Sequence, residues 1–362
     1  MNSETKTQNP NLQPNSLRQK HINRLKIVGS LLTVIGIGLF AYFIYSVGVN
    51  EILEGVGKIG FGGFTIILAI YFTRICTRAF AWKLSVSEPH KLDLRDTVPA
   101  VIIGEAMSSM IPLGILISGT TKAVAVRNRV PLVVGFSSIA TENLFYSLVT
   151  SLLIIFGAIS FLRTFELERG WIISIDVLIG VLIFLLLLGI LMVIRQWHFA
   201  SSLCNWLYNR HIGRTFLENG RLQVLLFENL IYGFYRKYPK RFLPIMLLQI
   251  AFHALGVLEV WFILSKISEA VPSVFTAFLL ESVSRLITIV FKLIPFVIGV
   301  DEAGAQFITE TLAIGAGVGI MLAIIRKGRI LFWTAVGLLF IIKRGLSLDE
   351  ISKIGNEQQA EI

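Results

Sequence analysis

The stretch WIISIDVLIGVLIFLLLLGILMVI, residues 171–194, decides the fold class of this chain. Asp176 is its one charged side chain. A helix of about 20 apolar residues crosses the hydrocarbon core of a bilayer, and this stretch exceeds that length. A helix that is apolar on every side belongs in lipid or in the core of a large protein. The segment therefore predicts a transmembrane helix.

Apolar segments of similar length recur along the chain, most clearly at residues 27–47, 64–84, 132–162 and 242–264. Two more, 97–117 and 273–293, are interrupted by or end at prolines, and a last one, 315–342, carries a basic cluster. The chain is 54% hydrophobic and only 15% charged, whereas a soluble domain is nearer a quarter charged. We therefore expect an all-α polytopic membrane protein, with an integral domain over residues 27–345 and no soluble catalytic domain.

The two ends of the chain are polar. Residues 1–26 form a polar tail that is longer than the lead of a cleaved signal peptide and has no small-residue cleavage site, so 27–47 is expected to remain as the first span. Residues 346–362 form a second polar tail.

Basic residues set the expected orientation. Segment 195–241 holds eight Lys and Arg side chains, and the N-terminal tail ends in a basic run, whereas 48–63 and 265–272 hold one lysine each. Because cytoplasmic loops of membrane proteins are enriched in Lys and Arg, both tails and 195–241 should be cytoplasmic. Segment 195–241 also carries Leu222, Leu226, Leu230 and Phe234 on one helical face. It is expected to form either amphipathic helices on the membrane surface or a packed helical hairpin.

Two segments are expected to enter the membrane and turn back. The arm 97–111 is too short to span the core, and Pro112 and Gly114 follow it. A re-entrant hairpin there would keep the basic residues after it on the cytoplasmic side and would imply a cavity. Segment 273–293 would form a second hairpin at Pro295, although it is long enough to be a full span instead. The first reading gives about six full spans and two re-entrant hairpins.

The two halves show the same order of features. Each half has a proline turn, a segment with small residues and a charge, and a long helix with a charge inside it. An inverted-topology repeat, about 27–163 and about 171–345, would place a site at the interface between the halves. Chance similarity between apolar segments is the competing explanation.

Charged residues at membrane depth are the candidate site, because such residues usually face a bundle interior or a cavity. The candidates are Arg74, Arg78, Glu105, Lys122, Glu142, Glu281, Arg285, Asp301, Glu302, Arg326 and Arg329. Arg78 could instead extend to the membrane surface, and Glu281 with Arg285 could pair at i, i+4. Arg326 and Glu142 follow their prolines at nearly the same interval, so they are expected to face each other.

This constellation suits a polar headgroup, because the planar guanidinium of arginine matches two phosphate oxygens. The first hypothesis is a lipid translocator for an anionic phospholipid or a lipid-linked intermediate. The alternatives are a non-transporting scaffold that presents 195–241 to a partner, and an ion-coupled small-solute transporter. An internal network that only fixes helix packing would explain the same charges.

Other functions have no signal in the sequence. We find no HExxH, GxSxG or Walker A motif, and the five histidines lack metal-ligand spacing. No enzyme activity, cofactor or metal is therefore expected. The net charge of +10 sits beside the spans, so it indicates anionic lipid and not nucleic acid. Membrane lipids are the expected partners, with a homodimer or an enzyme partner as further hypotheses.

Two blocks resemble a known family. They run from Ile111-Pro112 through SGTTK (118–122) to ATEN (140–143), and from FKLIPFVIGVDEAG (291–304) to IRKGR (325–329). Over about residues 26–345 the chain is similar to the lysylphosphatidylglycerol synthase transmembrane region, also called flippase-like. It departs from the family pattern at Lys122 and Asn143, where the family often has arginine.

The resemblance implies a bacterial inner-membrane protein that moves or binds lipid. In bifunctional members, a cytosolic aminoacyl transferase follows the membrane domain. This chain ends soon after its last expected span, so the resemblance implies a stand-alone member. It supports flippase-like function and not lysyl transfer.

Overall fold

The computed structural model describes residues 45, 49–110, 114–165, 169–210, 214–269, 272–291, 294 and 297–343, all helical or connecting, with no strand among them. Apart from Tyr45, the predicted first span lies outside these residues. Both tails and the predicted turns at Pro112 and Pro295 also lie outside them. The prediction of an all-α membrane protein is confirmed.

Long and short helices occur in the same order twice. The first set is α2 (Val49–Leu84), α3 (Leu94–Met110), α4 (Gly114–Ala125) and α5 (Leu132–Thr164). The second is α9 (Phe242–Ile267), α10 (Val274–Val290), α11 (Val300–Thr311) and α12 (Ala316–Lys343). In each set a long helix precedes a pair of 17 and 12 residues, and a second long helix follows. The same order of helices thus occurs in both halves, and the inverted-topology repeat itself stays a prediction.

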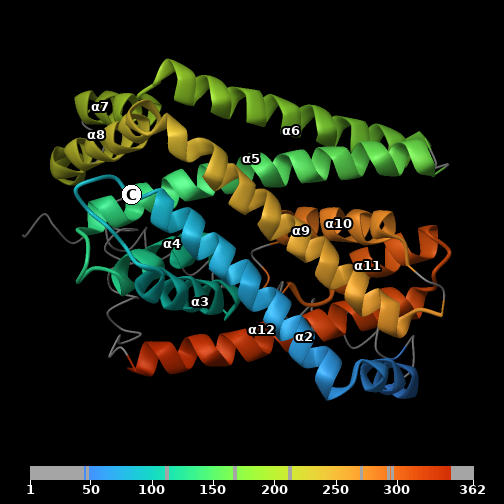
Figure 1. Ribbon diagram of the computed structural model, residues 1–362. Coiled ribbons are helices and arrows are strands. Elements are labelled where there is room, and N and C mark those ends of the chain that lie inside the picture. Colours follow the sequence, from blue (N-terminus) through green and yellow to red (C-terminus); the bar gives the residue numbers. More distant parts are fainter. Residues whose placement is uncertain are drawn as a thin grey trace, which may run out of the picture.

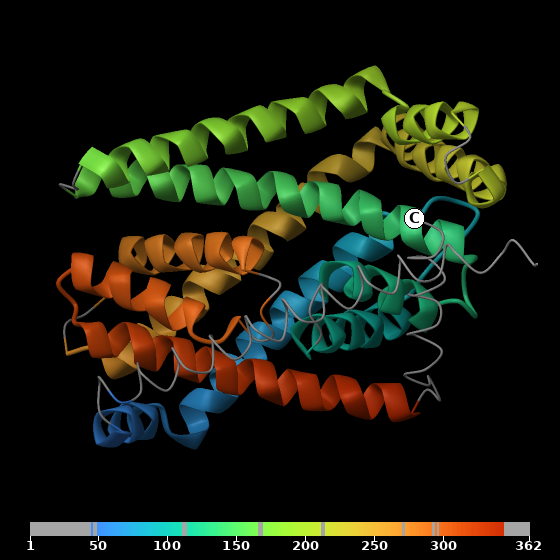
Figure 2. The same cartoon turned by 180° about the vertical axis from the view of Figure 1, so that it is seen from behind.

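Packing follows the same plan. Helices α2 and α9 run side by side through the centre, with α3 and α4 toward one end and α10 and α11 toward the other (Figures 1 and 2). α3 packs on α12 of the other set, and α10 packs on α5. Each short pair is therefore held by the long helix of the opposite half. The opposite orientation of the halves in a membrane stays a prediction, as does the re-entrant character of the short pairs.

Among the described residues, four helices are long and apolar enough to cross a membrane: Gly57–Leu84, Leu132–Thr164, Ile172–Arg195 and Pro239–Ile267. They correspond to four of the predicted spans. α12 has 28 residues but carries Arg326, Lys327 and Arg329 in its middle. α2 bends at Gly60, whose φ of 62° suits glycine, and this bend lies near the start of the span Gly57–Leu84.

A link of helices joins the two sets. It consists of α6 (Arg169–Arg195), α7 (Phe199–Asn209), α8 (Arg214–Lys237) and a short 3₁₀ turn, Pro239–Arg241. α6 runs beside α5 on the outside of the molecule, and no residue of its apolar window is buried in the protein (Figures 1 and 2). α7 and α8 pack on each other and α8 packs on α5, as in the predicted hairpin, and whether the pair also lies on the membrane surface stays a prediction.

Two apolar cores lie along α2. Ile67 belongs to a core shared with α9, α10 and α12, whereas Ile75 belongs to a core shared with α3, α4 and α5. Arg74 lies between them and is fully buried. The chain therefore places a charged group at the centre of its packing.

Candidate functional site

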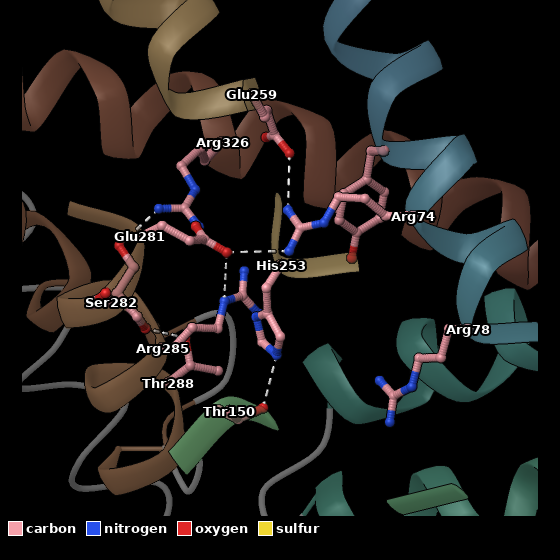
Figure 3. Close-up of polar contacts among 12 residues, drawn as sticks. Arg74, Arg78, Thr150, His253, Glu259, Glu281, Ser282, Arg285, Thr288 and Arg326 are labelled. Carbon is pink, nitrogen blue, oxygen red and sulfur yellow. Dashed lines mark hydrogen bonds and ion pairs between the residues drawn. The ribbon is translucent and has the colours of Figure 1, made fainter. Parts of the chain in front are cut away.

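Arg74 joins three helices. Its Nη1 donates to Glu259 Oε2 of α9 at 3.0 Å, and its Nη2 donates to Glu281 Oε1 of α10 at 3.2 Å (Figure 3). Gly256 provides the room for this contact, because a Cβ there would lie 2.4 Å from Glu281 Oε1. The guanidinium thus links the first half of the chain to the second.

Glu281 is the hub of the cluster. Besides Arg74, its carboxylate accepts from Arg285 Nε at 2.7 Å and from Arg326 Nη2 at 3.1 Å (Figure 3). Arg326 Nη1 also donates to Ser284 Oγ at 2.7 Å. One buried carboxylate therefore holds three arginines, from α2, α10 and α12.

The cluster carries more positive than negative charge. Arg329 of α12 pairs with Glu259, so Arg74, Arg285, Arg326 and Arg329 surround two carboxylates. Two positive charges remain in excess within this group. We name these four arginines with Glu259 and Glu281 the arginine cluster. A buried excess charge is costly, so the cluster is suited to an additional anion.

Arg285 is the most exposed member of the arginine cluster, and its terminal nitrogens are unused by the described residues. Its side chain is 12% exposed, against 1% for Arg74 and 4% for Arg329. Its contacts to described residues use Nε, and no described residue accepts a hydrogen bond from its two terminal nitrogens. These nitrogens can donate to an incoming oxyanion in the forked geometry that phosphate takes.

A histidine lies beside Arg285. His253 Nε2 is 2.9 Å from Thr150 Oγ1 of α5, and its ring stacks on Tyr146 (Figure 3). His253 is buried, and its Nδ1 has no hydrogen-bond partner among the described residues. The imidazole therefore offers a further polar atom at the edge of the arginine cluster.

A second group of charges surrounds Arg78. Its Nε donates to Glu142 Oε1 at 3.2 Å, and its Nη1 lies 3.8 Å from Glu105 Oε1. Gln249 donates to Glu142, and the Tyr71 hydroxyl donates to Glu105, both at 2.9 Å. One arginine thus faces two carboxylates, which is the opposite balance to that of the arginine cluster.

Several sequence predictions of contacts are settled by this geometry. The pairing of Glu281 with Arg285 is confirmed. The expectation that Arg326 faces Glu142 is wrong, because Arg326 reaches α10 and Glu142 pairs with Arg78. Arg78 does not extend to a surface, since its side chain is only 16% exposed and lies between two carboxylates. Equal spacing from two prolines does not fix how the long helices are rotated.

Besides Arg78, Glu105 and Glu142, three further candidates lie outside the arginine cluster. Lys122 is buried with its stem against Gly104, inside the pair α3 and α4. Glu302 pairs with Lys327 and accepts from the Gly299 amide at the start of α11. Asp301 is partly exposed in the first turn of α11.

Residues outside the predicted list complete the site. Glu259 and His253 carry the same signal as the others, a polar group within an apolar span, and Gln249 does so more weakly. Tyr71 precedes Arg74 by three residues and Arg78 by seven. These spacings put the three side chains on one face of α2. Helical spacing could therefore have indicated Tyr71.

Comparison with known proteins places the chain in a family. Residues 27–337 match the family described as the lysylphosphatidylglycerol synthase TM region. No curated protein and no solved structure matches the chain. The match covers both sets of helices, the link between them and the arginine cluster. This chain belongs to the family of the lysylphosphatidylglycerol synthase transmembrane region.

Proposed function

We propose that this protein translocates a lipid whose anionic headgroup, from a phospholipid or a lipid-linked intermediate, binds at the arginine cluster. The observation that carries the proposal is the excess of two positive charges among Arg74, Arg326 and Arg329, which are buried, and Arg285, which is partly buried, with their two carboxylates. The family is one of membrane proteins concerned with lipid.

Glu281 suggests how a headgroup would enter. Its two carboxylate oxygens accept hydrogen bonds from three arginines. A phosphate could replace the carboxylate and accept the same hydrogen bonds. Because those arginines come from both halves of the chain, exchange of Glu281 for a phosphate would change how the halves are held together. This gives a route by which binding moves helices. Under this proposal the protein is a carrier in the inner membrane of a bacterium and performs no enzyme chemistry.

Lipid movement between leaflets tests the proposal directly. The protein is reconstituted into vesicles with a fluorescent phosphatidylglycerol, and dithionite reports the label that reaches the outer leaflet. Arg285→Gln should lower movement about tenfold or more, since a hydrogen bond to a charged group contributes about 1.5–3 kcal/mol. Arg163→Gln, at an exposed arginine in the last turn of α5, should leave it unchanged.

One observation favours a second candidate. Each arginine of the cluster has a carboxylate partner inside the protein, as a fixed packing network would have. In a scaffold, the cluster would hold the helices and the link would bind a partner. Vesicles with wild-type protein that move no lipid under a pH gradient, a sodium gradient or no gradient would favour the scaffold. Stabilisation by a soluble solute, with no effect of lipid, would favour a solute transporter.

A further inference from the structure

Helix α7 has three faces of different character. Ser201 is buried toward α8. Ser202, Asn205 and Asn209 are exposed and polar, at spacings of three and four residues. Phe199, Leu203 and Trp206 are exposed and apolar at i, i+4 and i+7. Residues at these spacings share one helical face, so the apolar stripe is continuous and separate from the polar one.

The packed face is fixed in place by Glu228 of α8. Its carboxylate accepts from the backbone amides of Ala200 and Ser201 and from Ser201 Oγ, at 2.9, 3.4 and 2.6 Å. These bonds satisfy free amides at the start of α7 and fix its rotation about its own axis. These hydrogen bonds hold the opposite face of α7 against α8. The apolar stripe therefore points away from α8.

Chain connectivity places this stripe beside the membrane. α6 ends at Arg195 and α7 begins at Phe199, four residues later, so the two helix ends lie at most about 14 Å apart. α6 is a candidate span with no buried residue in its apolar window, so it faces lipid. In Figures 1 and 2 α7 lies where α6 ends. The start of α7 must then lie at the boundary between headgroups and water.

The side chains fit that boundary. Trp197 and Trp206 are about half exposed, and Arg210, one turn after Trp206, has its guanidinium 4.6 Å from the indole centroid. Tryptophan favours the membrane–water interface, where its ring lies at the level of the headgroups. The arginine guanidinium is attracted to the phosphates of anionic lipids. A stripe of phenylalanine, leucine and tryptophan that ends in arginine matches a lipid surface in both apolar and charged parts.

We propose that α7 docks on the surface of the bilayer, with Phe199, Leu203 and Trp206 below the headgroups and Arg210 on the phosphates of anionic lipids. The bilayer surface would thereby fix the hairpin of α7 and α8, and through α8 the end of α5. This role does not depend on lipid translocation. It differs from the sequence expectation for the stripe on α8, of which Phe234 is buried in the protein.

A fluorescent label tests the depth of α7. In the full chain with Cys76→Ser and Cys204→Ser, Leu203→Cys is labelled with an environment-sensitive probe and reconstituted into vesicles with nitroxide lipids. Emission should shift to the blue and be quenched by the nitroxide. Asn205→Cys, on the polar stripe of the same helix, is the matched control and should emit as in water without quenching.

Two results would overturn the proposal. Equal emission and quenching at 203 and 205 would show that α7 is not oriented on the bilayer. Blue-shifted emission at 203 without nitroxide quenching would show that protein, such as a second copy, covers the stripe.

The role of Arg210 is tested separately. Quenching at 203 should be stronger in phosphatidylglycerol than in phosphatidylcholine vesicles, and Arg210→Gln should abolish the difference. Equal quenching in both lipids with Arg210 present would reject the role of this arginine.

Discussion

At the residue scale, Glu281 and its arginines contribute unequally to stability. Glu281→Ala would leave Arg285 and Arg326 without their carboxylate and increase the excess positive charge. Its expected cost is about 3–5 kcal/mol, the range for breaking a buried ion pair. Arg326→Ala should cost clearly less, because Glu281 keeps Arg74 and Arg285. Thermal unfolding in detergent measures both.

The same measurement tests the partner of Arg326. The double change Arg326→Ala with Glu142→Ala should be additive, since the structure gives them different partners. A coupling well beyond about 0.5 kcal/mol, or an Arg326→Ala protein as unstable as Glu281→Ala, would contradict the described network.

Gly256 gives a second residue-scale prediction. A methyl group there would meet Glu281 Oε1 at 2.4 Å and Arg74 Nη2 at 3.0 Å, so Gly256→Ala must displace the ion pair. We expect a lower unfolding temperature and reduced lipid movement. Gly189→Ala in α6 is the control, because a Cβ there meets nothing within 4 Å. Equal unfolding temperatures of the two variants would show that Arg74 and Glu281 do not need this space.

At the element scale, the contact of α3 with α12 is the feature to test, because it joins one short pair to the opposite half. Ser109 Oγ lies 3.1 Å from Thr334 Oγ1. In a background of Cys76→Ser and Cys204→Ser, Ser109→Cys with Thr334→Cys should therefore form a disulfide under mild oxidation, detected by the loss of free thiols. Each single cysteine variant is the control.

The cross-link also bears on function. If translocation requires the halves to shift, the oxidised double variant should lose lipid movement and recover it on reduction. Free thiols that persist under oxidant would contradict the packing of α3 on α12. Full movement by the cross-linked protein would show that this contact stays closed during translocation.

At the scale of the whole molecule, the charge distribution predicts the topology. Segment 195–241 and both termini should face the cytoplasm, and 265–272 should face outward. A membrane-impermeant maleimide should label Lys266→Cys, an exposed residue at the end of α9, in intact cells. It should label Thr215→Cys only after the cells are opened. Efficient labelling of position 215 from outside would reject this orientation.

The sequence by itself determined the class of fold, because the length of an apolar segment is a local property that decides whether a helix suits lipid. It also determined contacts within one helix: Glu281 and Arg285 pair because four residues bring side chains to the same face. The prolines and short arms likewise indicated the short pairs α3 with α4 and α10 with α11.

Only the tertiary structure decided which charges meet. Arg74 and Glu259 lie 185 residues apart in the chain, and their contact depends on how α2 and α9 pack together and how each is rotated. A spacing rule misplaced Arg326 because a few residues of difference in a turn rotate a helix by a large angle. Charges inside spans identify the residues of a site, whereas helix packing selects their partners. An ion pair between helices requires that its two charges lie within a few ångströms, and no local sequence pattern specifies that distance.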